Sequence, residues 1–253
     1  MKRIWITGAS SGIGLELARL LLEQGHGVAV SARTVEPLNL LQQEYPNQVL
    51  IVAGDLAEAD EVQRMGERIR ALWGQLDQVI LNAGTCEYID VKQFEAAMVE
   101  RVMRANLLSA AHCIEVALPL LRNAQRGHIV AISSSVTYLP LPRAGAYGAS
   151  KAAMRYLFNS LRIDLASAGI DVTLVSPGFV DTPLTRKNDF PMPMRWPVEK
   201  AARHIVKRLP KRPLEIAFPT PFIAALRLLA LLPQRLQLHL GKQLSRPSTD
   251  KQS

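Results

Sequence analysis

The sequence predicts one α/β domain built on a doubly wound parallel sheet, and three observations support that prediction. Short apolar runs rich in Val and Ile recur along the chain, which is typical of strands buried on both faces. Longer stretches with apolar residues three or four positions apart separate these runs, as expected of helices. Six strand-like runs recur in alternation with helical stretches, and such alternation predicts a parallel sheet covered by helices on both faces.

Each expected element is a run with one of these two periodicities. Strands are expected at residues 4–7, 28–32, 49–53, 79–82, 129–133 and 172–176. Helices are expected at residues 15–24, 58–73, 94–121 and 147–167. Gly25 and Gly27 mark the end of the first helix and the turn into the second strand.

Composition restricts the class of protein. The 253 residues are 48% hydrophobic and 21% charged, which is typical of a globular chain with one large core. Cys86 and Cys113 lie in neither a CxxC pair nor a Cys/His cluster, so we expect two buried thiols, no disulfide framework, no metal site and a reducing cytoplasmic setting. The apolar run after Lys2 and Arg3 is too short for a signal peptide.

The positive charge of the chain is concentrated near its C-terminus. The formal net charge is +8, with a balance of −2 in residues 1–184 and +10 in residues 185–253. Nucleic-acid binding is one interpretation of such a basic region. The sequence has no DNA-binding motif and no alternation of aromatic and basic residues, so we do not expect a nucleic-acid partner.

The segment after the first expected strand reads Thr-Gly-Ala-Ser-Ser-Gly-Ile-Gly over residues 7–14. Gly8 permits a tight turn, Gly12 lets the backbone approach a pyrophosphate, and Gly14 lets the following helix pack on the strand. The helix N-terminus supplies free N–H groups and the positive end of a dipole. The alternative is a tight strand–helix connection without a ligand, but the position after the first strand favours dinucleotide binding.

The second strand end indicates which dinucleotide is bound. An acidic residue at this position would accept a hydrogen bond from the ribose 2′-OH of NAD. The chain has Ala32 and then Arg33, so no carboxylate repels a 2′-phosphate and a guanidinium can pair with it. We therefore expect NADP(H) as the cofactor; the alternative is that Arg33 is a solvated loop charge.

A candidate catalytic group follows the fifth strand. Tyr147 and Lys151 are four residues apart, which places them on one face of a helix. A neighbouring ammonium and a positive nicotinamide both favour the phenolate, which would let the phenol act as an acid or base near neutral pH. Ser134 lies 13 residues before Tyr147, and its hydroxyl can hydrogen-bond a substrate oxygen as charge develops there.

The glycine spacing and the Ser134–Tyr147–Lys151 trio resemble those of the short-chain dehydrogenase/reductase superfamily, in its single-domain branch. The resemblance covers about residues 3–181 and implies a Rossmann fold with an NADP(H) site. It implies cofactor contacts from these residues: Thr7, Gly8, Ser10, Ser11, Gly12, Ile13, Gly14, Arg33, Asp55, Leu56, Asn82, Ala83, Gly84, Tyr147, Lys151, Pro177, Gly178, Val180 and Thr182.

The resemblance also assigns individual roles. It implies that Asn106 distorts its helix and supports a water-linked proton relay to Lys151, where the alternative is a solvated helical Asn. Asp55 would bind the adenine amino group; the alternative is a cap of the helix near residue 58, and both roles are compatible. The Val180 backbone and the Thr182 hydroxyl would meet the nicotinamide carboxamide.

The function expected from these residues is hydride transfer between NADP(H) and a carbonyl compound or secondary alcohol. The main alternative is a non-catalytic NADPH-binding or sensing protein with the same fold, because a fold alone does not define a function. A sugar-nucleotide epimerase is less expected, because only about 70 residues follow Pro177 and Gly178. The resemblance further implies a homodimer or homotetramer built on the helices at 94–121 and 147–167.

Two C-terminal segments complete the expected domain organisation. Residues 1–220 form the Rossmann domain, and its segment 183–198 is expected to cover a pocket for an apolar carbonyl substrate, because it contains Phe190, Met192, Met194, Trp196 and four prolines. Residues 221–253 form an apolar and basic, helical extension. Its segment 221–246 either packs on the domain or a subunit interface, or binds peripherally to an anionic membrane.

Overall fold

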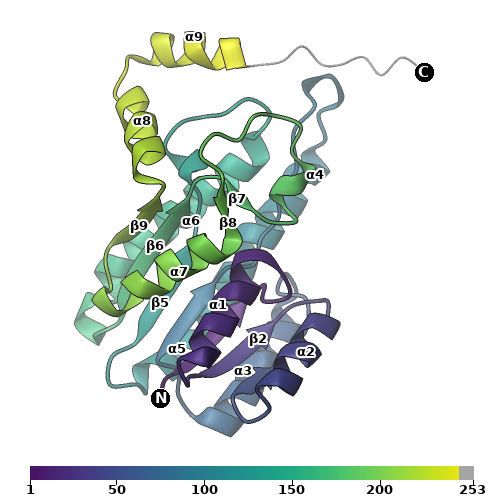
Figure 1. Ribbon diagram of the computed structural model, residues 1–253, viewed down its shortest axis with the longest axis vertical. Helices are drawn as coiled ribbons and strands as arrows, with labels where there is room; N and C mark the ends of the chain where they lie inside the picture. Colours follow the sequence, from purple (N-terminus) through teal and green to yellow (C-terminus); the bar gives the residue numbers. More distant parts are fainter. Residues whose placement is uncertain (245–253) are drawn as a thin grey trace.

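A computed structural model describes residues 1–244 and has three layers, with a parallel sheet between two layers of helices (Figure 1). The sheet has seven strands in the order β3-β2-β1-β4-β5-β6-β9. Every pairing in it is parallel. The predicted doubly wound Rossmann architecture is therefore confirmed.

The strands of the main sheet are β1 (Arg3–Thr7), β2 (Gly27–Ser31), β3 (Val49–Ile51), β4 (Gln78–Leu81), β5 (His128–Ile132), β6 (Asp171–Pro177) and β9 (Glu215–Phe218). A small second sheet pairs β7 (Val180–Asp181) with β8 (Trp196–Pro197). The helices are α1 (Gly12–Glu23), α2 (Glu36–Glu44), α3 (Ala59–Trp73), α4 (Ala96–Met103), α5 (Ser109–Arg122), α6 (Gly145–Asp164), α7 (Val198–Arg208), α8 (Thr220–Ala230) and α9 (Gln234–Leu244).

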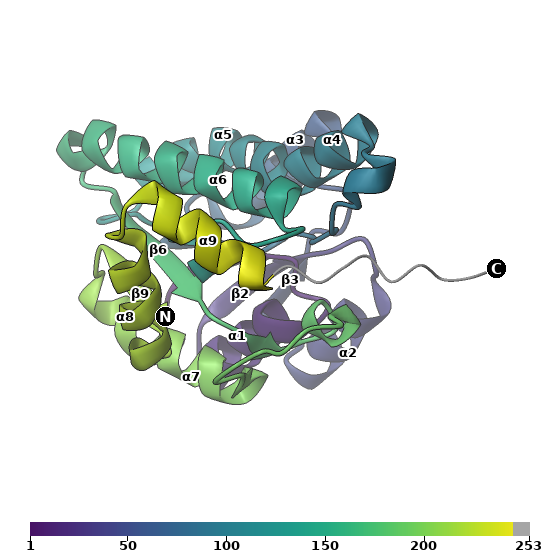
Figure 2. The ribbon, with the colours of Figure 1, turned by 90° about the horizontal axis from the view of Figure 1, so that it is seen from above.

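Alternation along the strands divides the core between the two faces of the sheet. Trp5 of β1 packs in the core under α3, α5 and α6, whereas Ile4 and Ile6 pack under α1, α2 and α7. Figure 2 shows these two helical layers on opposite sides of the sheet. The strand order reverses between β1 and β4, and ligands bind at such a point in doubly wound folds.

Several elements differ from the sequence prediction. The strand β9 and the helices α2 and α7 were not predicted; β9 has only four residues and lies between Pro213 and Pro219, so it forms no long apolar run. The helix expected at 94–121 is α4, a π-helical turn at Arg104–Leu108, and α5. A π turn holds one more residue than an α turn, and apolar periodicity does not reveal it.

The C-terminal extension is helical over its described part. α8 buries Ile223 and Leu226 against the domain. α9 lies beyond the carboxyl ends of the strands, at the end of the molecule that holds β7 and β8 (Figure 1). Within residues 1–244, no helix is both long and apolar enough to cross a membrane.

Candidate active site

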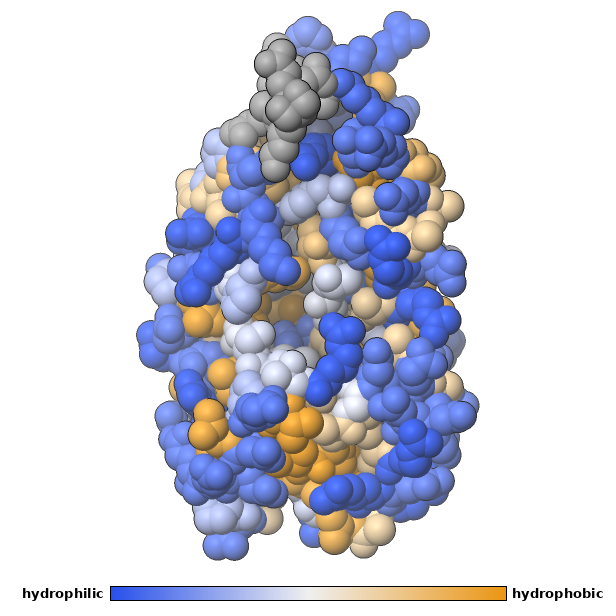
Figure 3. All heavy atoms as spheres, turned by 90° about the vertical axis from the view of Figure 1, so that its right-hand side faces the viewer, coloured by the Kyte–Doolittle hydropathy of each residue, from blue (hydrophilic) through white to orange (hydrophobic). Residues whose placement is uncertain are grey.

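A cleft of about 710 Å³ opens at the carboxyl ends of the strands. Figure 3 shows a hollow in the face of the molecule, with hydrophilic side chains around it. Most of the site residues expected from the sequence line this cleft, from the glycine loop to Thr182. Of the others, Thr7, Gly14 and Asn106 are not among its lining residues.

The glycine loop has three positions that do not tolerate a side chain: Gly8, Gly12 and Gly14. Gly8 and Gly12 have φ values of +66° and +57°, in the left-handed region that glycine tolerates. A Cβ at Gly8 would lie 2.8 Å from the Ala83 Cα, and a Cβ at Gly14 would lie 2.3 Å from the Gly8 carbonyl oxygen. These close approaches leave the α1 N-terminus open towards the cleft, which fits a dinucleotide pyrophosphate.

Hydrogen bonds join the glycine loop to the end of β4. The Thr7 hydroxyl accepts from the N–H groups of Asn82 and Ala83 at 3.0 and 3.1 Å. The Asn82 side-chain amide donates to the carbonyl oxygens of Thr7 and Gly8 at 3.1 and 3.0 Å. Thr7 is therefore placed behind the cleft, where it fixes two lining segments to each other.

Arg33 lies at the cleft with its side chain 80% exposed. Its Nη1 is 3.9 Å from Asp55 Oδ2, a distance too long for a strong ion pair. The Asp55 carboxylate accepts from the Ala57 N–H at 3.0 Å, and the cap residue of α3 is Glu58, so Asp55 does not cap that helix. The Arg33 guanidinium therefore remains available to an anion in the cleft.

Ser134, Tyr147 and Lys151 meet in one wall of the cleft. Ser134 follows β5 and is half-buried, while its neighbours Ser133 and Ser135 are buried. Its hydroxyl hydrogen-bonds with Tyr147 and accepts from the Val136 N–H at 3.2 Å. The Lys151 ammonium, on the next turn of α6, donates to the Ile132 carbonyl oxygen at 2.9 Å.

Burial controls the protonation of this wall. Burial raises the pKa of Tyr147 to about 12, although the hydrogen bond with Ser134 opposes the shift. Burial lowers the pKa of Lys151 to about 8. Burial therefore favours the protonated form of the Tyr147 phenol at neutral pH.

Asn106 lies fully buried inside the π-helical turn between α4 and α5. Its Oδ1 accepts from the Thr85 N–H at 2.6 Å, and its Nδ2 donates to the Thr85 carbonyl oxygen at 2.9 Å and to Ser150 Oγ at 2.8 Å. A Cβ on Gly84 would come within 2.9 Å of Asn106 Oδ1 and 3.4 Å of Lys151 Nζ. The side chain is not solvated; it ties the loop after β4 to α6 beside Lys151.

Four aromatic rings form a row that sequence patterning did not reveal as a unit. Phe179 is 6.0 Å from Phe190 and 5.6 Å from Phe222 between ring centroids, and Tyr88 is 5.6 Å from Phe190. Tyr88 also interacts electrostatically with Tyr147, which places this row beside the cleft wall. The rings come from a loop, from the β6–β7 connection, from segment 183–198 and from α8, so no periodicity connects them.

Segment 183–198 is tied to the domain by polar contacts. The Tyr88 hydroxyl donates to Asn188 Oδ1 at 2.8 Å, and Arg143 forms an ion pair with Asp189 at 3.2 Å. The segment therefore packs against the part of the domain that holds Tyr88 and Arg143, and it contributes Phe190 to the aromatic row.

The two cysteines are free thiols in different settings. Cys113 is buried in the core, as expected. Cys86 is only half-buried and lies near Tyr88 and Lys151, so the expectation of two buried thiols was wrong for this residue. Burial raises the pKa of the Cys86 thiol, which keeps it protonated.

Known proteins resemble this chain along most of its length. An uncharacterized oxidoreductase of Myxococcus xanthus is 33% identical to this chain, over 91% of this chain and 92% of its own length. A cis-4-hydroxycyclohexanecarboxylate dehydrogenase of Sinomonas cyclohexanicum is also 33% identical, over 87% of this chain and 88% of its own.

Solved structures share the fold. A short-chain dehydrogenase of Streptomyces avermitilis superimposes with a TM-score of 0.84 at 24% identity, over 97% of this chain and 98% of its own. The L-sorbose reductase of Gluconobacter frateurii, solved with NADPH and L-sorbose, gives a TM-score of 0.77 at 24% identity, over 86% and 94% of the two chains. The short chain dehydrogenase family model matches residues 2–191. The chain therefore belongs to the short-chain dehydrogenase family and is an oxidoreductase of that type.

Proposed function

We propose that this protein is an NADP(H)-dependent oxidoreductase that interconverts an apolar carbonyl compound and its secondary alcohol. The observation that carries the proposal is the convergence of Ser134, Tyr147 and Lys151 on the cleft that begins at the glycine loop. Bound NADPH would supply the hydride, and the protein would supply geometry and proton transfer.

The chain's own residues have separate roles in this proposal. The Tyr147 phenol, protonated at neutral pH, donates a proton to the carbonyl oxygen of the substrate. The Ser134 hydroxyl hydrogen-bonds the same oxygen, and the Lys151 ammonium holds the nicotinamide ribose and favours loss of the phenol proton. Asn106 holds the Thr85 backbone and Ser150 in place beside Lys151.

The preference for NADP(H) is supported by Arg33, which lies exposed at the cleft and only loosely paired with Asp55. A guanidinium there can bind a 2′-phosphate in a forked geometry. We expect Ala32→Asp/Arg33→Ala to reverse the preference, measured as kcat/KM with both cofactors. Arg19→Ala, which removes a cation from α1 outside the cleft lining, is the matched control. A wild-type preference for NAD(H) would contradict the assignment.

An apolar, cyclic substrate is supported by the aromatic row of Tyr88, Phe179, Phe190 and Phe222. One relative, at 33% identity, is a cis-4-hydroxycyclohexanecarboxylate dehydrogenase. NADPH oxidation should be measured against a panel of cyclic ketones, linear aldehydes and sugars. We expect turnover of cyclic ketones; an absence of turnover across a broad panel would instead favour a non-catalytic NADPH-binding protein.

Peripheral contact with an anionic membrane is supported by four exposed leucines, Leu228, Leu231, Leu236 and Leu238, in a region with a net charge balance of +10. Leu228 lies on α8, Leu231 directly follows α8, and Leu236 and Leu238 lie on α9. We expect salt-sensitive binding to anionic liposomes that Leu236→Gln/Leu238→Gln weakens and that Leu40→Gln/Leu72→Gln, on α2 and α3, does not. Equal binding by all forms would contradict a specific contact and favour a packing role.

A homo-oligomer is supported by the exposed apolar side chains of α6, where Tyr156 and Ile163 are 81% and 77% exposed. Exposed aromatic and aliphatic residues on one helix often mark an interface. We expect light scattering to give a dimer or tetramer and Ile163→Asp to lower the mass. A monomeric wild type would contradict this proposal.

A further inference from the structure

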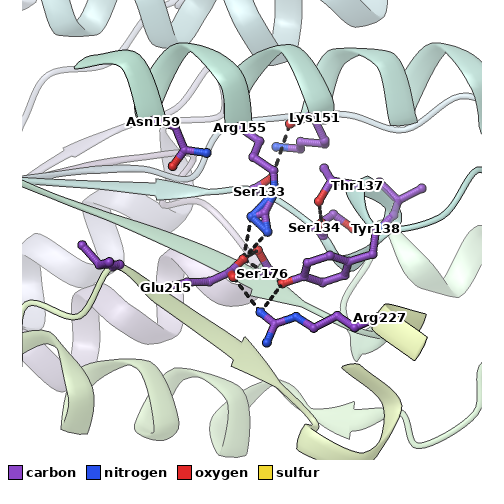
Figure 4. A network of polar contacts seen from close by, with 12 residues as sticks. Ser133, Ser134, Thr137, Tyr138, Lys151, Arg155, Asn159, Ser176, Glu215 and Arg227 are labelled. Atoms are coloured by element: carbon purple, nitrogen blue, oxygen red, sulfur yellow. Dashed lines mark hydrogen bonds and ion pairs between the residues drawn. The ribbon is translucent and has the colours of Figure 1, made fainter. Parts of the chain in front are cut away.

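The carboxylate of Glu215 lies where several segments of the chain meet (Figure 4). Glu215 begins β9, and its side chain is only 20% exposed. Its Oε1 accepts hydrogen bonds from the Tyr138 hydroxyl at 2.7 Å and from the Ser176 hydroxyl at 2.6 Å. These donors come from the turn after β5 and from β6, so one carboxylate joins three parts of the chain.

Two guanidinium groups complete what we call the Glu215 cluster: Tyr138, Arg155, Ser176, Glu215 and Arg227. Arg155 of α6 donates to Glu215 Oε1 through both terminal nitrogens, with Nη1 at 2.7 Å. Arg227 of α8 donates to Oε2 at 2.8 Å and to the Tyr138 hydroxyl at 3.2 Å. Their Cζ atoms lie 4.9 and 5.1 Å from the centroid of the Tyr138 ring, within cation–π range.

Three of the four partners of Glu215 are a short distance along the chain from the candidate active site. Tyr138 closes the turn that begins at Ser134, where the Thr137 hydroxyl donates to the Ser134 carbonyl oxygen at 2.9 Å. Arg155 lies one helical turn after Lys151. Ser176 directly precedes the Pro177–Gly178 segment of the cleft.

The charges of the cluster make its geometry specific. Burying a carboxylate costs free energy unless hydrogen bonds and counter-charges replace its water. An apolar contact would hold the same segments together without this cost, but it would not fix the direction of the Tyr138 hydroxyl. If Glu215 lost its charge, Arg155 and Arg227 would repel each other across the Tyr138 ring, and the turn from Ser134 would lose its outer support.

We propose that Glu215 is a positioning residue of the active site. Its carboxylate fixes Tyr138, and thereby the turn that directs the Ser134 hydroxyl into the cleft. Through Arg227, the same carboxylate holds α8 against this turn, so the C-terminal extension supports the catalytic wall. This inference rests on the proposed function, in which Ser134 meets the substrate oxygen.

The kinetic test uses Glu215→Gln, which keeps the shape and removes the charge, and Glu67→Gln on the exposed face of α3 as a matched control. We expect Glu215→Gln to lower kcat about tenfold while the Kd for NADPH, measured by fluorescence, changes less than about twofold. In a Ser134→Ala background the same substitution should cause no further loss, because Glu215 acts through Ser134. Multiplicative losses in the double variant, or an unchanged kcat in Glu215→Gln, would overturn the inference.

Hydrogen exchange of the full-length protein tests the positioning without turnover. We expect Glu215→Gln to accelerate amide exchange in residues 133–138 and in α8, but not in the glycine loop at 7–14. Unchanged exchange at 133–138 would overturn the inference. If Glu215→Gln accelerates exchange but the wild-type protein turns over no substrate, the proposed function is overturned and the positioning role of Glu215 stands. Tyr138→Phe, which keeps every charge, decides the question by the same measurements if Glu215→Gln does not fold.

Discussion

At the amino ends of β4, β5 and β6, His128 lies between Gln78 and Thr173, whereas at the carboxyl ends Ser134 and Lys151 line an open cleft. Gln78 Nε2 lies 3.1 Å from His128 Nδ1, His128 Nε2 lies 2.9 Å from Thr173 Oγ1, and Thr173 donates to the Pro213 carbonyl oxygen at 2.7 Å. Since the Thr173 proton is used by Pro213, His128 must donate through Nε2 and accept through Nδ1. This chain of hydrogen bonds closes on the backbone and stabilises a neutral imidazole.

The carboxyl end holds similar polar groups, but their hydrogen bonds end at the surface of the cleft. Lys151 is anchored to one carbonyl oxygen, and Ser134 and Tyr147 hydrogen-bond to each other at the cleft surface. Polar groups whose hydrogen bonds all end within the protein contribute to stability. Polar groups that face a cleft can bind a ligand, so the two ends of one sheet should respond differently to substitution.

The largest expected effect is at the carboxyl end. Removing the phenolic hydroxyl in Tyr147→Phe should lower kcat by about 1000-fold, because it removes the proposed proton donor. The Kd for NADPH and the thermal midpoint should change little, since the ring remains in place. Retention of more than about a tenth of the activity would show that the proton comes from another group.

At the amino end the opposite pattern is expected. His128→Leu leaves Gln78 without its partner and Thr173 without its donor, so it should lower the free energy of unfolding by about 3 kcal/mol. Chemical denaturation measures this change, and kcat of the folded fraction should stay within about twofold of wild type. A variant of normal stability with reduced kcat would contradict the structural role of His128.

The pH dependence of stability provides a smaller test of the same region. Burial lowers the pKa of His128 from 6.5 to about 3, so only the unfolded chain binds a proton there as the pH falls below 6.5. Stability is therefore lost on acidification, and between pH 7 and 5 this group should account for about 2 kcal/mol. The loss should be present in wild type and missing in His128→Leu; equal slopes for the two proteins would contradict it.

The smallest expected effect is the pH profile of reduction. Burial lowers the pKa of Lys151 to about 8, so its positive charge is lost as the pH rises through that value. If the charge supports proton transfer, kcat/KM should be flat below pH 7.5 and fall about tenfold per pH unit above 8. Lys151→Arg, which keeps its charge, should be slower but should show no such fall; the same fall in both proteins would assign it to another group.

The sequence predicted the two ends of the sheet unequally. Glycine spacing and the Ser134–Tyr147–Lys151 pattern revealed much of the cleft. Close backbone approach and a shared helix face both require particular residues at short, fixed spacings in the sequence. His128, Gln78 and Thr173 gave no signal, since Gln78 and His128 directly precede expected strands and Thr173 looks like an ordinary interruption of an apolar run. Glu215 was equally hidden, because its strand β9 is short and its partners lie far away in the chain.

The order in which the chain is synthesised gives the Glu215 cluster a further consequence. Glu215 follows Tyr138 by 77 residues, and Arg227 follows Tyr138 by 89 residues. Domains begin to fold while the chain leaves the ribosome from its N-terminus. The glycine loop, Ser134 and Lys151 therefore all emerge before Glu215 and Arg227, which orient the turn from Ser134 to Tyr138. A nascent chain could form its dinucleotide cleft early. The wall that holds Ser134 would reach its final geometry only after α8 has been synthesised.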